Sequence, residues 1–466
     1  MKIIPLLIST AIIGIIPFGC AVGPDFHKPK PEAPAQWVGL TNATPAAATT
    51  PTTAPADLTN WWTKFQDPGL VSLIDEGFRT NLDLKIAESA VRAARASRGI
   101  VNGTLWPSLT GTAAYSRGAV GKAPSTDTFA AGLDAAWELD IFGGNRRNVE
   151  SATATILAQQ ENLNDVRVTL AAEIAVDYIQ LRSFQEQIAI ANENLKSEQR
   201  TAELTRRKLA AGFSSALDVA NAEAQVATTS STIPVLETSK IQVIYALSVL
   251  LARPPGDLLD ELSKPGPVPL TPPEVPMGMP SELMRRRPDI RQAEAQLHAA
   301  TAQIGVAKAD YFPQFSLTGN INYQSDLVRN LFAGTSRLWG VGPTMTWNIL
   351  QGGAITANVR LQRELTEQAY LTYRKTILTA LQDVENALLA FDKEWDHRKA
   401  LNEAVAQNRK AVDLSNQLYS QGTIDFLTVL DAERSLYASE TALAQSKGSI
   451  STDLVALYKA LGGGWE

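Results

Sequence analysis

The stretch PQFSLTGNINYQS, residues 313–325, decides which fold this sequence encodes. Apolar residues and glycine alternate strictly with serine, threonine, asparagine and glutamine along it. The apolar-side positions are Phe315, Leu317, Gly319, Ile321 and Tyr323. A period of two predicts a β-strand with one apolar face and one polar face. The sequence on either side is helical in pattern, so the medium that meets the apolar face has to be identified from the rest of the chain.

Composition excludes several classes of protein. The chain has 466 residues, a formal net charge of −6 and no basic tract, which argues against nucleic-acid binding. One cysteine allows no internal disulfide. His27, His298 and His397 are far apart in the sequence, and no nucleophile-elbow, P-loop or dinucleotide-binding pattern occurs in a suitable context. We therefore expect no enzyme activity, no metal site and no cofactor.

The first residues predict export from the cytoplasm. Residues 1–19 contain a lysine and then an apolar run that is too short for a comfortable membrane span, as in a signal peptide. Cys20 follows and resembles the end of a bacterial lipobox, so we expect it to be lipidated, with palmitate among the acyl groups, and to start the mature chain. Pro17 and Phe18 depart from the usual lipobox, and the alternative is cleavage elsewhere with Cys20 as a bystander. Ala21 in place of aspartate favours the outer membrane.

The chain contains two copies of one unit. DLKIAESAVRAARASRGIVNGTLWPSLTG begins at Asp83, and DIRQAEAQLHAATAQIGVAKADYFPQFSLTG begins at Asp289. FGGNRR and QGGAIT follow in the same order, which indicates duplication. The expected segments are a lead rich in Pro, Ala and Thr over 20–57, repeat 1 over 58–252, a Pro-rich linker over 253–280 and repeat 2 over 281–461.

Each repeat predicts a helix, two strands, a long helix, a turn and a return helix. The expected strands are about 108–118, 128–141, 314–325 and 337–350; the long helices are 145–211 and 354–421, and the return helices are 215–252 and 425–460. Each long helix would measure about 100 Å at 1.5 Å per residue. Apolar residues recur along both at steps of three and four, as in a coiled-coil seam.

Four strands cannot close a barrel, which takes about eight. An open sheet in lipid would leave unpaired backbone groups, each costing several kcal/mol. If the apolar faces meet lipid, the strands must therefore close with strands from other chains, and the polar faces would line water. Three chains would give twelve strands, although the residues alone do not select three over two or four.

Several motifs resemble one family over almost the whole mature chain. RRRPDIRQAEAQLHAATAQIGVAKADYFPQFSLTG, GTIDFLTVLDAERSLYASE, LYKALGGGW and the opening CAVGPDFHKPKPEAP are similar to the outer-membrane factors of tripartite efflux systems, in their TolC-like, OprM-like lipoprotein branch. The resemblance implies a mainly α protein with membrane β structure. It implies a homotrimer with a 12-stranded outer-membrane barrel, a long periplasmic α-helical barrel and a mixed equatorial domain.

The same resemblance implies a function. Such proteins are passive exit ducts for drugs or other small molecules, and they contribute to antibiotic resistance. They dock onto a periplasmic adaptor protein and an inner-membrane transporter. The protein would lie in the outer membrane of a Gram-negative cell and extend into the periplasm. The transporter and the adaptor usually set the substrate, which this chain does not name.

The two long helices end in glycine turns. Glycine just past a helix end accommodates positive φ, and Ser215 and Asp425 suit the N-caps of the return helices. By resemblance, the adaptor would dock at these turns. The expected docking residues are Gly212, Phe213, Ser214, Gly422, Thr423 and Ile424.

A gate is expected one turn beyond the second of these turns. Leu427, Asp431 and Arg434 are spaced to share one helix face. The resemblance implies that they line a closed periplasmic constriction, with three leucines plugging it and three aspartates forming a ring that needs cationic partners such as Arg434. Without the resemblance, an ordinary solvated helix face is the better interpretation.

Three acidic residues near the second strand have two interpretations. Asp134, Glu138 and Asp140 would line the barrel wall and favour cations, or some of them would lie as surface charges at the periplasmic rim. Other classes explain less of the chain. A coiled-coil scaffold would not need the strands or Cys20, and a self-sufficient porin would need many more strands.

Overall fold

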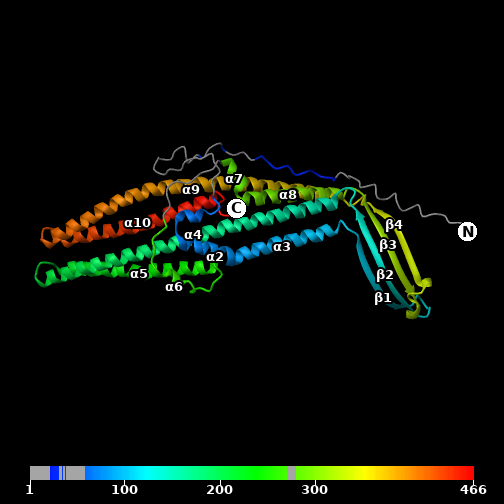
Figure 1. Ribbon diagram of the computed structural model, residues 1–466, viewed down its shortest axis with the longest axis horizontal. Coiled ribbons are helices and arrows are strands. Elements are labelled where there is room, and N and C mark those ends of the chain that lie inside the picture. The colour runs from blue at the N-terminus through cyan, green and yellow to red at the C-terminus, as the bar shows by residue number, and fades with distance from the viewer. Residues whose placement is uncertain (1–20, 31–33, 35–36, 38–57, 270–279, 466) are drawn as a thin grey trace. The chain divides into compact units, whose positions relative to one another are not determined.

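The computed structural model describes residues 21–30, 34, 37, 58–269 and 280–465 and divides them into two compact units (Figure 1). Unit 1 contains the described residues 21–30, 89–160 and 292–374, and unit 2 contains the other described residues. The expected signal peptide and Cys20 lie outside the described residues. The fold class is confirmed, since the chain combines long helices with a single four-stranded sheet in the described residues.

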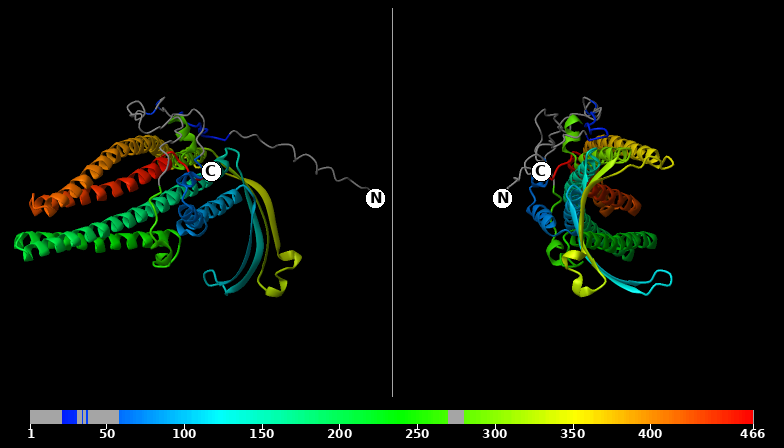
Figure 2. Two further views of the ribbon diagram at one scale, coloured as in Figure 1. Left: turned by 60° about the vertical axis from the view of Figure 1, so that its left-hand side comes forward. Right: turned by 90° about the vertical axis from the view of Figure 1, so that its right-hand side faces the viewer.

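Unit 1 is built on that sheet. Its strands are β1 (Ser108–Gly118), β2 (Thr126–Leu139), β3 (Gln314–Ser325) and β4 (Arg337–Thr346). They are antiparallel and adjacent in chain order, so β1 and β4 form the two edges. The sheet is curved in both views of Figure 2.

Two predicted strands have different bounds in the structure. β4 ends at Thr346 rather than at residue 350, and β2 runs from Thr126 to Leu139 rather than over 128–141. Beyond β4 the backbone folds on itself, because the Ile349 amide donates to the Trp347 carbonyl at 3.1 Å. The Trp347 indole donates to the Tyr311 carbonyl at 3.1 Å, which ties this turn to the chain before β3. Local hydrogen bonds therefore end the strand before the apolar alternation ends.

The helices of the whole chain follow the same order in each half of the sequence. The longer ones are α2 (Pro68–Thr80), α3 (Leu82–Gly103), α4 (Gly144–Ala210), α5 (Ala216–Leu250), α8 (Pro288–Ala309), α9 (Ala354–Ser420) and α10 (Phe426–Ala460). The short ones are η1 (Trp61–Phe65), α6 (Leu259–Leu262), α7 (Pro280–Arg286), η2 (Val328–Asn330) and η3 (Gly334–Ser336). α4 and α9 have 67 residues each, and α5 and α10 have 35 each.

Unit 2 contains two helical hairpins, one between α4 and α5 and the other between α9 and α10 (Figure 1). Pro234 lies inside α5, and the helix continues through it. Near the chain ends, Trp61 is buried and stacks on Tyr458 with ring centroids 5.3 Å apart. Aromatic packing of this kind joins the first described helix to α10.

The sequence before the first strand forms two helices that meet at Asn81. The Asn81 side chain donates to the Leu250 carbonyl at 2.8 Å and accepts from the Leu84 amide at 2.9 Å. It therefore ends α2, caps α3 and fixes both against the last turn of α5. α3 begins at Leu82 because this side chain accepts a hydrogen bond from an amide of its first turn.

The end of α5 contains a strained residue. Ala252 has φ 56° where its counterpart after α10, Gly462, has φ 73°. In both places the next amide donates back to a carbonyl five residues earlier, from Arg253 to Ser248 at 2.8 Å and from Gly463 to Tyr458 at 3.0 Å. This is the left-handed helix terminus that glycine fits and alanine does not.

Replacing Ala252 by glycine should therefore stabilise unit 2 by about 1 kcal/mol. The matched control is Ala246→Gly, an exposed position inside α5, which should destabilise it by about 1 kcal/mol. Thermal unfolding in detergent should give a higher midpoint for the first variant and a lower one for the second. A lower midpoint for both would contradict the assignment of strain to Ala252.

Candidate functional site

The register of the sheet places all apolar-side positions on one face. Gly111, Leu133, Ile321 and Trp339 form one row across the four strands. Leu133, Ile321 and Trp339 are 46%, 39% and 69% exposed, so nothing within the described chain covers this face. Large exposed apolar surfaces mark contact with a membrane or a partner.

The ends of this apolar face are aromatic. Tyr115, Phe129 and Tyr323 lie near the loop ends of the strands, and Trp137 and Phe315 lie near the helix ends. The charged residues of the face occur only at the loop ends of the strands: Arg117, Asp127 and Arg337. An apolar band between two aromatic girdles is typical of strands that cross an outer membrane.

The other face of the sheet is polar. One row across it contains Thr110, Asp134, Asn320 and Gly340. Asp134 and Glu138 are the only charged residues on this face of the four described strands. This wall could therefore line water.

Asp140 does not belong to that wall. It follows the end of β2, and its carboxylate accepts from the Asn145 amide at 3.1 Å and the Arg146 amide at 2.9 Å. It also pairs with the Arg146 side chain at 3.2 Å. Asp140 thus stabilises the positive start of α4, and only 12% of its side chain is exposed.

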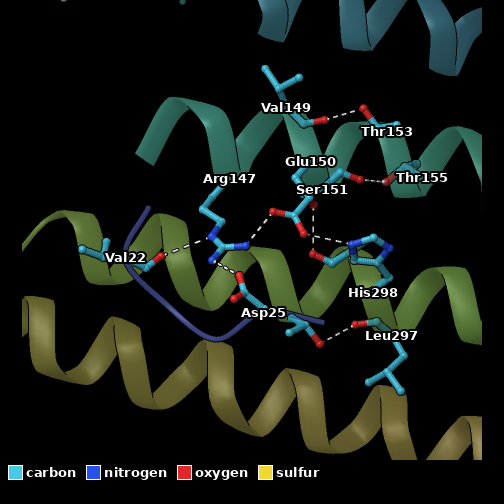
Figure 3. A network of polar contacts seen from close by, with 12 residues as sticks. Val22, Asp25, Arg147, Val149, Glu150, Ser151, Thr153, Thr155, Leu297 and His298 are labelled. Carbon is cyan, nitrogen blue, oxygen red and sulfur yellow. Dashed lines mark hydrogen bonds and ion pairs between the residues drawn. The ribbon is translucent and has the colours of Figure 1, made fainter. Parts of the chain in front are cut away.

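The described start of the chain is held against unit 1 by a buried arginine (Figure 3). Arg147 of α4 is 6% exposed and binds Asp25 at 2.6 Å, Glu150 at 2.8 Å and the Val22 carbonyl at 3.3 Å. Burial alone would lower the pKa of Arg147, but the hydrogen bonds that it donates to Asp25 and Glu150, together with the charges of these carboxylates, outweigh burial and raise that pKa. The arginine therefore stays charged, and it fixes the chain start to α4.

Further contacts extend this attachment along α8. The Glu150 carboxylate accepts from the His298 Nε2 at 2.9 Å, and Phe26 stacks on the same ring with ring centroids 4.4 Å apart. Lys28 pairs with Glu294 at 2.7 Å. We call residues 21–30 the strap. His27 and His397 take no part in these contacts, and no group of His, Cys, Asp and Glu in the described residues could hold a metal ion.

The strap begins beside the end of the sheet. A Cβ built on Gly143, between β2 and α4, would lie 2.7 Å from the Ala21 Cα, and the Val22 amide donates to the Phe142 carbonyl at 3.0 Å. Gly23 makes an equally close approach to Gly305 of α8, with φ 106°. Consecutive Cα atoms are about 3.8 Å apart. The preceding residue, Cys20, is therefore bonded to a chain that is fixed where the strands end.

The two turns predicted as docking sites have the same geometry. Gly212 and Gly422 have φ 80° and 77°. The Phe213 amide donates to the Lys208 carbonyl at 2.8 Å, and the Thr423 amide donates to the Leu418 carbonyl at 3.0 Å. Each turn is then closed by an N-cap: Ser215 and Asp425 accept from amides three residues on, at 3.1 Å and 3.0 Å.

The six turn residues differ in exposure. Phe213 is 81% exposed, whereas Ile424 packs on a buried cluster that joins the two hairpins. The cluster consists of Ala202, Ala222, Tyr419, Phe426, Val429 and Leu430. Of the predicted docking residues, Phe213 thus offers apolar surface, and Ile424 helps to hold the turn in place.

The three predicted gate residues all lie on α10 and are exposed, but they differ in their partners within one chain. Leu427 is 48% exposed and Asp431 is exposed. Arg434 instead donates from Nε to the Gln225 side-chain oxygen of α5 at 2.8 Å. Among the described residues Asp431 has no salt-bridge partner, so Arg434 does not neutralise the Asp431 charge within one chain.

Sequence reasoning missed the strap contacts of Arg147 and the buried residues Glu198, Gln225 and Glu433. Asp25 and Arg147 are 122 residues apart, and Thr201 and Glu433 are 232 apart. No local sequence pattern predicts contacts between residues so far apart. The start of α4 does contain several charged residues, Arg146, Arg147 and Glu150, which is a weak indication of a polar contact there.

Comparisons with known proteins agree with this geometry. The model of the family described as outer membrane efflux protein matches residues 73–253 and 279–463. Nodulation protein T of Rhizobium leguminosarum bv. trifolii is 32% identical over 464 residues, covering 98% of this chain and 97% of that protein. Toluene efflux pump outer membrane protein TtgC of Pseudomonas putida is 33% identical over 469 residues, covering 98% and 96%. The solved outer-membrane channel OprN superposes with a TM-score of 0.87 at 34% identity, covering 96% of this chain and 100% of that one.

Proposed function

The chain belongs to the outer membrane efflux protein family, and we propose that three copies of it close one duct that leads from the periplasm to the outside. It is an outer-membrane channel component of an efflux system, and it lies in the outer membrane of a Gram-negative cell. The proposed points are how the strands close into a barrel, which proteins bind the channel and which residues form its gate.

One observation carries the proposal: the sheet has an exposed apolar face and two open edges. Within the described chain, the edge strands β1 and β4 each pair on one side only, with β2 and with β3, and their outer sides have no partner strand. Unpaired backbone groups cost several kcal/mol each in hydrocarbon, so the edges have to pair with other copies. Three sheets of four strands give about twelve, which leaves room for an aqueous lumen lined by the polar face.

The helices support the same assembly. α5 is 35 residues long and, by length and composition, apolar enough to cross a membrane, and only 17% of its most apolar window is buried. Leu217, Val235 and Val249 on it are 66%, 65% and 63% exposed. In a trimer, helices of neighbouring copies would cover this surface and complete a periplasmic helical barrel.

We assign the ends of the hairpins to contacts with partners. The exposed Phe213 and the neighbouring turn residues Gly212, Ser214, Gly422 and Thr423 would meet a periplasmic adaptor, which in turn would join an inner-membrane transporter. Transport would be passive and need no catalytic step. The relatives are named for toluene efflux and nodulation, so small molecules are the proposed cargo. Crosslinking in native membranes would test the partners, because it should capture a trimer with an adaptor attached.

We also propose that Cys20 is acylated and that the strap sets where its acyl group enters the membrane. The strap holds Ala21 beside Gly143, directly after the last strand residues of β2. An acyl group on Cys20 would start at the level where the apolar band of the sheet ends. Acyl chain and sheet would then occupy the same leaflet, and two attachments anchor a protein more firmly than one.

The gate would be formed by Leu427 and Asp431 of three copies. Both are exposed in one chain, as expected for side chains that meet other copies on the channel axis. Arg434 would act by holding α10 to Gln225 of α5 rather than by neutralising its own Asp431. Opening would be a movement of the hairpin ends that partners favour.

The two faces of β3 provide a direct test of membrane insertion. Ile321→Arg on the apolar face should cost about 2–4 kcal/mol near the bilayer midplane. Asn320→Arg, one residue away on the polar face, should be nearly neutral. In cells that lack the chain, the Asn320 variant should restore trimers in the outer membrane and export of a fluorescent amphiphilic dye, and the Ile321 variant should restore neither. Equal behaviour of the two variants would contradict the proposal.

Acylation of Cys20 has a separate readout. Mass spectrometry of the purified protein should find a chain that starts at Cys20 and carries acyl groups. A Cys20→Ala variant should lack that mass and enter the outer membrane less efficiently, since it keeps only the sheet as an anchor. An unmodified internal Cys20 in the native protein would overturn this part of the proposal.

The gate is tested by conductance. The double variant Asp431→Ala and Arg434→Ala should raise single-channel conductance in planar bilayers, because it removes a side chain from the constriction and a hydrogen bond that holds α10. Ser435→Ala, an exposed position on the same helix, is the matched control and should conduct like the native protein. Unchanged conductance in the double variant would exclude these residues from the gate.

A further inference from the structure

Unit 2 buries two glutamates that neither the proposed gate nor the docking turns use. Glu198 of α4 is 4% exposed and Glu433 of α10 is 8% exposed. Buried carboxyl groups are normally paired with a cation or surrounded by several donors, because desolvation of the charge is costly. Neither glutamate has a salt bridge among the described residues.

Glu198 is only half satisfied. Its Oε1 accepts from the Gln225 amide at 3.0 Å and from the Thr229 hydroxyl at 2.9 Å, both on α5. Its Oε2 is buried and has no hydrogen-bond partner. An ionised carboxylate left in this state would carry an uncompensated oxygen.

Glu433 belongs to the same polar cluster. Its Oε1 accepts from the Thr201 hydroxyl at 2.8 Å, and Thr201 lies one turn after Glu198 on α4. The next residue, Arg434, donates to the Gln225 side chain that holds Glu198. α10 is therefore joined to the α4–α5 hairpin at two adjacent points, above the apolar cluster at the hairpin ends.

Burial of the pair favours its protonated forms. Burial raises the pKa of Glu198 above its ordinary value of 4.5, although the Thr229 and Gln225 hydrogen bonds and the charge of Arg434 oppose this. Burial also raises the pKa of Glu433 from 4.5, and repulsion from Glu198 adds to the effect while the Thr201 hydrogen bond opposes it. Arg434 and the two carboxyls are thus the charged groups that act on the pair, and α9 supplies none of those groups.

We propose that Glu198 and Glu433 form a proton-operated latch between α10 and the α4–α5 hairpin, which holds the proposed gate closed when it is protonated. The inference rests on the proposed channel function, because α10 also contains Leu427 and Asp431. A protonated carboxyl can donate a hydrogen bond, and it removes the repulsion between the two groups. Two ionised carboxylates repel each other and require water, which reaches them once the hairpins part.

The sign of the pH effect follows. Because both pKa values are raised in the folded state, the latch stabilises the closed contact at low pH and loses that contribution as pH rises through the folded-state pKa values, above 4.5. The open probability of the native channel should therefore increase as the pH rises from 4.5. The increase should be up to about tenfold for each unit by which burial raises the pKa of a glutamate.

Single-channel recording of the purified trimer across this pH range tests the latch. Glu198→Gln and Glu433→Gln keep the shape of the side chains without the charge, and each should flatten the increase. Glu203→Gln, an exposed glutamate on α4 that pairs with Arg207, is the matched control and should keep it. Asp431→Asn should also keep it, which separates the latch from titration of the proposed gate ring.

The outcomes are distinct. A pH response that survives in both glutamine variants, is absent from the native channel, or disappears in Asp431→Asn would overturn the latch while leaving the channel intact. Absence of conductance from every protein, including the Asp431→Ala and Arg434→Ala double variant, would overturn the proposed function and the latch together.

If the glutamine variants do not assemble, amide hydrogen exchange in the native protein tests the latch instead. After correction for the intrinsic increase of amide exchange with pH, the amides of residues 429–437 must lose protection as the pH rises. The loss must be larger than that of the amides of residues 450–458.

Discussion

Unpaired backbone groups at the edges of the sheet are the constraint on which the rest of this structure depends. The four strands present a continuous apolar face, so the sheet is suited to hydrocarbon, but hydrocarbon offers no hydrogen bonds to β1 and β4. In the proposed trimer, further copies of the chain would remove that cost. The same closure would give the polar face of the sheet, with Asp134 and Glu138, a lumen to line, and the exposed apolar residues of α5 would pack against neighbouring copies.

The sheet could be predicted from the sequence because alternation is a local signal. The ends of the strands could not be predicted as well. The alternation continues to residue 350, but β4 ends at Thr346 because the Trp347 indole donates a hydrogen bond to the chain before β3. Among the described helices, α5 alone has the length and hydropathy of a membrane span. In strands, by contrast, lipid-facing residues alternate with polar ones and never form a long apolar run. That one face of the strands meets lipid therefore had to be inferred from the alternation of apolar and polar residues.

The polar contacts between distant segments could not be predicted. Arg147 meets Asp25 across 122 residues, and Arg434 meets Gln225 across 209. Neither residue differs locally from a solvated charge on a helix. The two turns proposed for docking could be predicted because their glycines are a local signal, but the partly buried position of Ile424 depends on two hairpins packing together. Burial of Glu198 and Glu433 likewise arises only where α4, α5 and α10 meet.

Disulfide crosslinking between the two edge strands tests the central claim most directly. One cysteine placed in β1 at Thr110, Thr112 or Ala114 is combined with one in β4 at Gly340, Gly342 or Thr344, in a Cys20→Ala background. Cβ atoms of directly paired residues lie about 4.5–5.5 Å apart, so one register of the scan should crosslink efficiently. The account predicts covalent trimers from outer membranes on non-reducing gels. Chains that remain monomeric throughout the scan, or that crosslink only within one chain, would contradict it.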